Sequence, residues 1–231
     1  MSDETLVKAL DSPSHIRTLA AQRTLLGRAD SIELTESLGK LSCNTDKALS
    51  TRIAAIFTMS LRSPESGALM ALVAGRTLPE IQPFLIRAYG EVTHPISVDG
   101  ALDVFTKIPE GSNPREIVEA IFALSKLNEK QESPKAAVFI SKYLSSTDPA
   151  IRHTAYRALA KMSAHEAAFS KVNSDDTETR KAAAWALMRM HKKDVVEGLL
   201  VRLKSENIPE KRRPLLSTLA RLYHKEAEWK G

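Results

Sequence analysis

The stretches DPAIRHTAYRAL at residues 148–159 and DTETRKAAAWAL at residues 176–187 align without a gap. In each stretch an Arg at the fifth position is followed by Ala at offsets of three and six and by Leu at an offset of seven. These offsets lie on one side of an α-helix, and the small alanines allow a neighbouring helix to approach closely. The pattern therefore predicts two helices of the same kind, each packed along one apolar stripe.

The same register occurs along the rest of the chain with weaker identity. The anchor positions, which are the positions equivalent to that Arg, are Arg17, Arg52, Gln82, Ile117, Arg152, Arg180 and Arg212. Successive anchors are 28 to 35 residues apart, a spacing that holds two helices and two turns. The sequence therefore predicts about seven helical pairs in a single array over residues 1–231. The units lie at roughly 1–30, 31–63, 64–93, 94–129, 130–162, 163–191 and 192–231.

Each unit is expected to contain a first helix, a turn and then the helix that carries the apolar stripe, called the stripe helix below. Asp148-Pro149 and Asn113-Pro114 look like an N-cap followed by Pro at the first helical position, and Asp46 and Asp176 are further cap candidates. No segment shows the alternation of a β-strand. The predicted fold class is all-α, a right-handed α-solenoid.

The composition agrees with this class. The chain has 231 residues with 43% hydrophobic side chains, and 29 of its residues are Ala and 27 are Leu, which favour helix. This apolar content excludes a disordered chain, and no apolar run reaches the roughly 20 residues of a membrane span. A single Cys43 excludes an intrachain disulfide framework. The N-terminal residues show no export signal, so the sequence as written is expected to stay in the cytoplasm.

The pattern Asp-Pro-x-x-Arg-x-x-Ala-x-x-Ala-Leu at 148–159 resembles the HEAT repeat and its shorter bilin-lyase-type relatives. In that family the turn Asp and the helix Arg commonly pair along the stack as a ladder between neighbouring units. The resemblance implies that Asp148, Arg152, Asp176 and Arg180 have this structural role. It also implies a surface for protein partners, with no chemistry of its own.

The C-terminal stretch LARLYHKEAEWKG at 219–231 and the opening stretch at 6–26 resemble the HEAT segment of large planctomycete-type multidomain proteins. In those proteins a sugar-dehydrogenase-like propeller precedes the helices and a cytochrome c module often follows. The resemblance implies that the chain is a segment of a longer protein, in contact with adjoining domains, in the periplasm or cell envelope. The sequence has no Cys-x-x-Cys-His, so no haem is expected on this chain.

Motifs for catalysis are weak. His165-Glu166 resembles one His-Glu pair of the HEAT-type deoxyhypusine hydroxylases, but the residues after the anchors Arg152 and Arg180 lack the further pairs that a di-iron site needs. No two His have zinc-site spacing, and Cys43 has no His nearby. The glycines are scattered as in caps and turns, and none forms a phosphate loop. We therefore expect a protein that is not an enzyme, with no cofactor, metal or small-molecule substrate.

Positive charge is concentrated at the C-terminal end. Residues 1–115 have a net charge of −1, residues 116–231 have +6, and 179–231 contain 13 Lys and Arg against 6 Asp and Glu. The clustered candidates for binding an anionic partner are Lys192, Lys193, Arg202, Lys204, Lys211, Arg212 and Arg213. Some of them fall near predicted helix ends, where a cation is favourable without any partner.

HEAT-type alkylpurine DNA glycosylases, which bind DNA in a basic groove next to a Trp or Tyr, provide one further comparison. Trp185 is the residue of this chain that such a site would use, but the alanines around it suggest that it fills the core. The sequence thus favours a non-catalytic scaffold that mediates protein–protein or interdomain contacts. The alternative is a module that binds nucleic acid or another anionic partner through its basic C-terminal units.

Overall fold

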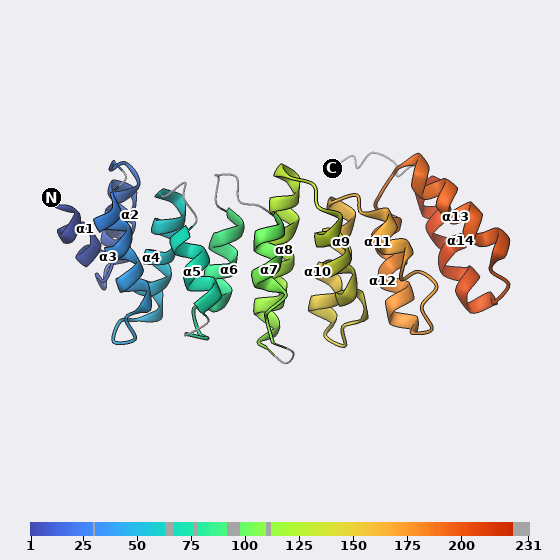
Figure 1. Ribbon diagram of the computed structural model, residues 1–231, viewed down its shortest axis with the longest axis horizontal. Helices are drawn as coiled ribbons and strands as arrows, with labels where there is room; N and C mark the ends of the chain where they lie inside the picture. The colour runs from blue at the N-terminus through green and yellow to red at the C-terminus, as the bar shows by residue number, and fades with distance from the viewer. Residues whose placement is uncertain (30, 63–66, 76–77, 92–97, 110–111, 224–231) are drawn as a thin grey trace. The chain divides into compact units, whose positions relative to one another are not determined.

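The computed structural model describes residues 1–29, 31–62, 67–75, 78–91, 98–109 and 112–223, with the backbone alone for 67–70. These ranges contain fourteen α-helices and one short 3-10 helix, and they contain no strand (Figure 1). The predicted all-α class and the prediction of about seven helical pairs are confirmed. In chain order the helices are α1 (Asp3–Ala9), α2 (His15–Leu26), α3 (Ile32–Cys43), α4 (Leu49–Arg62), α5 (Gly67–Gly75), α6 (Gln82–Glu91), α7 (Val98–Phe105), α8 (Pro114–Lys130), α9 (Pro134–Lys142), η1 (Tyr143–Ser145), α10 (Pro149–Lys161), α11 (His165–Phe169), α12 (Thr177–Leu187), α13 (Lys193–Ser205) and α14 (Pro209–Tyr223).

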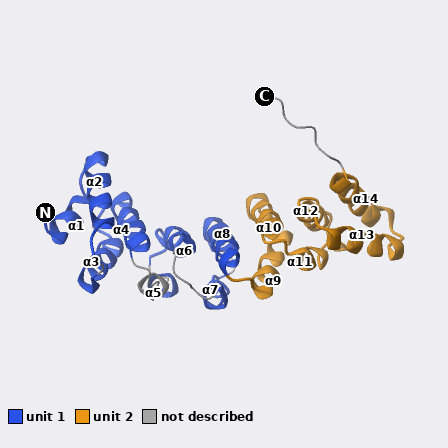
Figure 2. Cartoon of the chain, turned by 90° about the horizontal axis from the view of Figure 1, so that it is seen from above, with its two compact units in different colours: residues 1–130 blue, residues 131–231 orange. Residues whose placement is uncertain are grey.

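The chain divides into two compact units, Met1–Lys130 and Gln131–Gly231, called unit 1 and unit 2 below (Figure 2). The division falls at the predicted boundary between the fourth and fifth repeats. Whether all seven repeats form one array stays a prediction.

Helices stack in the same way inside each unit. Each odd-numbered helix packs against the even-numbered helix that follows it, from α1 with α2 to α13 with α14. The stripe helices also pack on one another, α2 on α4, α4 on α6 and α6 on α8 in unit 1, and α10 on α12 and α12 on α14 in unit 2. This succession of stacked pairs is the helical-repeat arrangement that the HEAT resemblance implied.

The predicted apolar stripe forms the core. The alanines and leucines at offsets three, six and seven of α10 and α12 are all buried, as are Leu85, Ala88 and Tyr89 on α6. The first repeat differs. Ala20 is exposed and Ala21 and Leu25 are buried instead, so the register of α2 is displaced by one residue and Arg17 is not its anchor.

Two of the predicted caps have a clear local cause. The Asp148 carboxylate accepts hydrogen bonds from the backbone N–H of Ala150 and Ile151, and Pro149 follows at the first helical position. Asn113 Oδ1 accepts from the N–H of Arg115 at the start of α8. The cap expected at Asp46 is wrong, because α4 begins only at Leu49 and the Asp46 N–H donates to Asn44 Oδ1 in the preceding turn.

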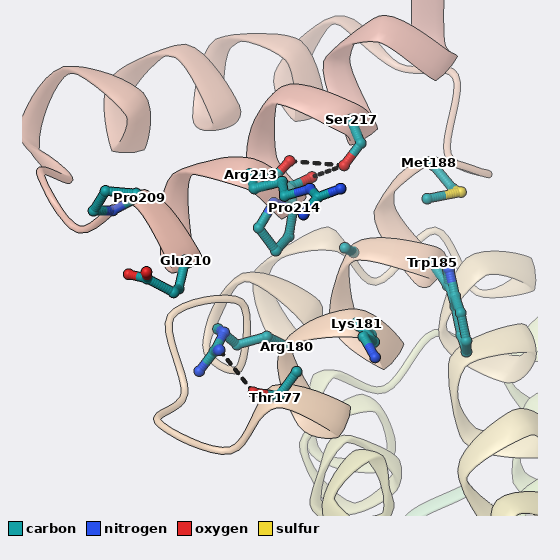
Figure 3. Close-up of a pocket in the computed structure, with 11 residues that line it drawn as sticks. Thr177, Arg180, Lys181, Trp185, Met188, Pro209, Glu210, Arg213, Pro214 and Ser217 are labelled. Atoms are coloured by element: carbon teal, nitrogen blue, oxygen red, sulfur yellow. Dashed lines mark hydrogen bonds between the residues drawn. The ribbon is translucent and has the colours of Figure 1, made fainter.

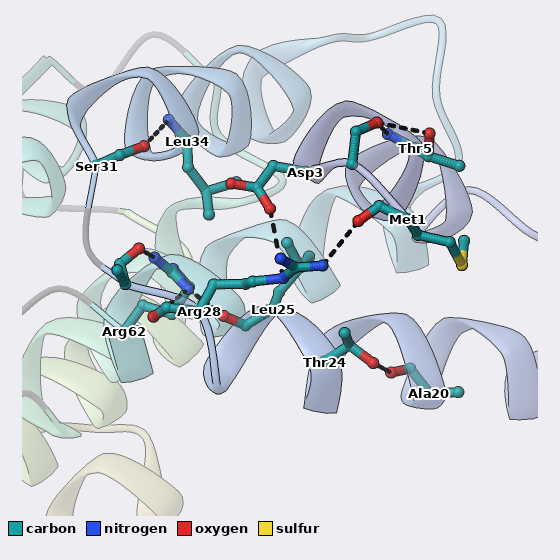
Figure 4. Close-up of polar contacts among 12 residues, drawn as sticks. Met1, Asp3, Thr5, Ala20, Thr24, Leu25, Arg28, Ser31, Leu34 and Arg62 are labelled. Atoms are coloured by element: carbon teal, nitrogen blue, oxygen red, sulfur yellow. Dashed lines mark hydrogen bonds and ion pairs between the residues drawn. The ribbon is translucent and has the colours of Figure 1, made fainter.

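Arginines also close helix ends in unit 1 (Figure 4). The guanidinium of Arg62, at the end of α4, donates to the Leu25 carbonyl in the last turn of α2 and to the carbonyls of Arg28 and Ala29 just after that helix. Arg28 in turn donates to the Met1 carbonyl at 2.7 Å and pairs with Asp3 at 3.6 Å. A cation at a helix C-terminus satisfies carbonyls that have no partner within the helix. These contacts connect α1, α2 and α4.

Candidate functional site

The anchor arginine of unit 2 connects neighbouring repeats. Arg152 Nη1 donates to the Ser146 carbonyl at 2.7 Å, in the turn before its own helix, and Nη2 pairs with Glu178 Oε2 on α12 at 3.3 Å. Arg52 in unit 1 has the same two contacts, with the Ser42 carbonyl at 3.0 Å and with Glu80 at 2.8 Å. In both cases the acidic partner stands two residues before the next anchor, so the acceptor of Arg152 is Glu178 and not the predicted ladder residue Asp176.

Asp176 instead caps α12. Its carboxylate accepts from the Thr179 hydroxyl and the Thr179 N–H, both at 2.6 Å. These hydrogen bonds, with the hydroxyl contact the larger, hold the pKa of Asp176 below its usual value, and the nearby Arg152 charge adds to the effect. The stabilisation from this carboxylate is therefore present above the usual pKa of 3.8 and is lost as the pH falls through the lower pKa of the folded state.

We expect thermal melts of the protein between about pH 6 and pH 3 to show a smaller decline for Asp176→Asn than for the unchanged protein, because the variant has no carboxylate to protonate. The loss of stability that comes from protonation of other acidic groups remains in both proteins. Circular dichroism at each pH measures the difference in melting temperature. An equal decline in the two proteins would contradict this role for Asp176.

Arg180 turns back onto its own repeat. Its Nη1 donates to the Ser174 and Asp175 carbonyls, both at 2.7 Å, and its Nη2 donates to the Thr177 hydroxyl at 2.9 Å. Lys211 on α14 makes the contact between these repeats by pairing with Asp175 at 2.7 Å, which holds the pKa of that carboxyl below its usual value. Arg180 is 7% exposed and stabilises the turn before α12.

The structure distributes the seven predicted basic residues over different sites. Lys192, Lys193, Arg202 and Lys204 lie on α13 or at its N-cap, where Lys193 pairs with Glu197 and the Arg202 guanidinium stacks 3.8 Å from the Phe169 ring centroid. Arg212 donates to the carbonyls of Leu203 and Glu206 at 2.6 and 2.5 Å. Of the seven, Arg213 lines the groove that is described next.

An open groove of about 640 Å³ lies between the stripe helices α12 and α14 (Figure 3). Ala184, Met188 and Pro214 give it apolar walls, and Arg213 and Lys181 stand on its two sides. The remaining lining residues are Thr177, Arg180, Trp185, Pro209, Glu210 and Ser217. This volume lies within the range of about 300–1,000 Å³ that is common for ligand sites.

Trp185 stands on this groove, so the expectation that it fills the core is wrong. Its side chain is 40% exposed, and one edge packs against Tyr156 of α10 with ring centroids 5.5 Å apart. The reason is helical geometry: the apolar stripe lies three, six and seven residues after the anchor, whereas Trp185 comes five residues after it, on the side of the helix opposite to the stripe. Arg189 lies over the other ring of this pair, with its Cζ 5.1 Å from the Tyr156 centroid.

Positions one, five and nine after each anchor form a common outer face along the three stripe helices of unit 2, with Arg189 just after the C-cap of α12. All nine of these side chains are exposed and none is acidic. The first position is occupied by His153, Lys181 and Arg213, the fifth by Arg157, Trp185 and Ser217, and the ninth by Lys161, Arg189 and Arg221. We call this set the cationic face.

The acidic residues near the cationic face lie along one edge. Glu178 and Glu210 occupy the positions two residues before the anchors of α12 and α14. Glu178 is already engaged by Arg152 and by Lys181 at 2.9 Å. Among the described residues, neither Arg157 nor Arg213 has an ion pair with a carboxylate. The face therefore presents a net positive charge with a Trp at its centre.

Features of other kinds of site are absent from the described part of the chain. No group of three or more His, Cys, Asp and Glu side chains there is arranged to hold a metal ion. His165 lies 3.6 Å from Glu166 at the start of α11, without a second pair beside it. Within those same ranges, no helix combines the length and the apolar character that a membrane crossing requires.

Comparison with known proteins finds similar solved structures at low sequence identity. No family model and no curated protein matches the chain. Among solved structures, the complex of CpcE and CpcF of phycocyanin lyase from Nostoc sp. PCC7120 is 12% identical with a TM-score of 0.46, over 96% of this chain and 95% of that chain. An engineered protein is 22% identical with a TM-score of 0.48, over 95% of this chain and 67% of that one. A designed armadillo repeat protein in complex with the peptide (KR)4 is 17% identical with a TM-score of 0.36, over 96% of this chain and 100% of that one.

Proposed function

We propose that this protein is a non-catalytic helical-repeat scaffold that binds a protein partner, or an adjoining domain of a longer chain, in the groove between α12 and α14. The observation that carries the proposal is the position of Trp185. A Trp that is 40% exposed beside an open groove with apolar walls is the type of residue that dominates binding at protein interfaces. The contact with Tyr156 holds its ring in place before any partner arrives, so little side-chain entropy is lost on binding.

The lining of the groove also favours binding over catalysis. A catalytic site needs a nucleophile or a general base next to its orienting group. The groove offers two hydroxyls, Thr177 and Ser217, and both are engaged within the chain: Thr177 accepts from Arg180, and Ser217 donates to the Arg213 and Pro214 carbonyls. Glu210 is its acidic residue. These groups support recognition of a polypeptide by apolar contact and hydrogen bonding.

Selection from a random peptide display library against the whole protein tests this function. Peptides recovered on the unchanged protein should bind Trp185→Ala about thirtyfold more weakly, as expected for the loss of an interface hot spot. Trp fluorescence during titration provides an independent measurement of binding. Melting curves of the variant establish that it is folded.

Phe122→Ala is the matched control, because Phe122 is an aromatic residue on the stripe helix α8 of unit 1 and is 50% exposed. It should leave binding of the selected peptides unchanged. If the selection yields no binder, or if both substitutions weaken binding equally, the groove is not the docking site.

A further inference from the structure

The cationic face indicates the chemistry of the partner. Positions one, five and nine of the stripe helices of unit 2 carry seven Lys, Arg or His residues together with Trp185 and Ser217. The same positions of α4 in unit 1 carry Ile53, Phe57 and Leu61.

In unit 1 these positions also carry Arg87 on α6 and Lys126 on α8, but both pair with carboxylates, Arg87 with Glu119 and Lys126 with Glu91. The excess of positive charge at these positions therefore lies in unit 2. The turns before α10 and α12 are closed by Asp148, Asp176 and Arg180, without a contribution from these exposed cations.

We propose that the partner segment bound by unit 2 is an acidic, extended polypeptide that crosses the three stripe helices. It places an apolar side chain in the groove beside Trp185 and its carboxylates against Lys181, Arg213 and the arginines Arg157 and Arg189. This proposal rests on the proposed function, since it names the chemistry of the partner of the same groove. Complementary charge both orients such a segment and accelerates its association.

The dimensions of the face suit an extended chain. Helices packed about 10 Å apart place three stripe helices over about 20 Å, and an extended chain covers this distance in about six residues at about 3.3 Å per residue. Alternate side chains of an extended chain point in opposite directions. A segment with acidic residues two positions before and after one Leu or Phe therefore presents its carboxylates and its apolar side chain to the same face, where they meet the cations and the groove.

The apolar groove favours a polypeptide over a nucleic acid. Nucleic acids are held by cations along the phosphate backbone and, when single-stranded, by several aromatic side chains on which successive bases stack. Trp185 is the one exposed aromatic on the cationic face, and the groove next to it is lined by Ala184, Met188 and Pro214. These apolar walls would be left unused by a phosphate backbone, whereas a Leu or Phe side chain fills them.

Glu210 limits where the bound segment lies along the stripe helices. It lines the groove at the edge of the cationic face, opposite the side where Arg189 and Arg221 stand in the sequence register. A carboxylate of the partner is repelled at this edge and attracted at the other. The bound segment is therefore expected to cross the helices on the Arg189 side of Glu210.

The test uses fluorescence anisotropy with the whole protein and a labelled peptide of about 10 residues, long enough to cross the face, in which a single central Leu is flanked on both sides by Glu residues. A counterpart with Gln in place of Glu has the same length and the same apolar residue. We expect the Glu peptide to bind about tenfold more tightly at low salt and to lose this advantage at high salt, because exposed charges are screened. The double substitution Lys181→Glu and Arg213→Glu should weaken the Glu peptide about tenfold or more and leave the Gln peptide unchanged.

The matched control is the double substitution Lys192→Glu and Lys204→Glu, which makes the same charge change on exposed residues of α13. It should leave both peptides unaffected. Equal weakening by the two double variants shows attraction by net charge alone and overturns the proposal. Tighter binding of a DNA oligonucleotide or of phosphatidylglycerol vesicles than of the Glu peptide, lost in Lys181→Glu with Arg213→Glu, overturns it in favour of that ligand.

Failure of this inference is distinguishable from failure of the proposed function. If peptides from the random library bind at Trp185 but are not enriched in acidic residues and are insensitive to salt, the groove binds protein and the acidic partner is wrong. If no peptide from the library binds and the Glu peptide does not bind either, both proposals fail.

Discussion

Substitution of Gly90 by Ala is expected to destabilise unit 1 by about 2–3 kcal/mol. Gly90 lies in the last turn of α6, where a Cβ would stand 2.6 Å from the Cα and 2.7 Å from the Cβ of Ala123 on α8. A backbone atom has no rotamer to change, so the two helices must separate. The close packing of α6 against α8 is then lost.

Helix propensity by itself predicts the opposite result, since Ala is favoured over Gly by about 1 kcal/mol in a helix interior. Gly39→Ala is therefore the matched control: it lies within α3 and a Cβ there has no atom within 4 Å. Urea denaturation followed by circular dichroism, together with hydrogen exchange of the α6 and α8 amides, measures the effect. The interpretation fails if Gly90→Ala is as stable as Gly39→Ala.

Gly90 also shows what the repeat pattern leaves out. From sequence, the scattered glycines look like caps and turns, and Gly27 does form the C-cap of α2. Gly39 and Gly90 lie inside helices, and Gly90 is needed because a neighbouring helix passes close to it. The sequence alone does not show which helix approaches which residue, so this requirement becomes visible only once α6 and α8 are packed.

The fold was largely predictable because its signal is local and repeated. Offsets of three, six and seven from the anchor give the buried stripe, and seven copies of it give the helical pairs. The predicted register of the first repeat is wrong because it rests on two residues alone, Arg17 and Ala20. In the structure Ala21 and Leu25 occupy the core instead.

The candidate site is less predictable, because cations that cluster along the sequence do not lie on one face of the fold. The run from Lys192 to Arg213 is continuous in sequence, but it spans α13 and α14, and most of its members contact α13, its caps or the preceding turns. The cationic face instead draws three residues from each of the three repeats of unit 2. Aligning the repeats by anchor and comparing positions one, five and nine is the signal that finds it, since those offsets lie opposite the buried stripe.

Arg180 and Lys181 are neighbours in sequence with different expected roles. Arg180→Ala should lower the free energy of unfolding of unit 2 by about 3 kcal/mol, since three hydrogen bonds from a buried charged group are lost and the carbonyls of Ser174 and Asp175 lose their donor. The free energy of unfolding of Arg180→Lys should lie between those of Arg180→Ala and the unchanged protein, because one ammonium does not reproduce the planar guanidinium fork.

Lys181→Ala is the control for stability and the test for binding. Its side chain is 50% exposed and its pair with Glu178 is a surface ion pair, so the substitution should cost less than about 0.5 kcal/mol. Lys181→Ala should nevertheless weaken binding of the acidic peptide. Arg180→Ala should weaken this binding only to the extent that it unfolds unit 2. Urea denaturation and anisotropy on the three variants separate these effects. If Lys181→Ala proves the more destabilising of the two, or if Arg180→Ala abolishes peptide binding while unit 2 remains fully folded, the division between a structural anchor and a binding face is wrong, and Arg180 itself belongs to the docking surface.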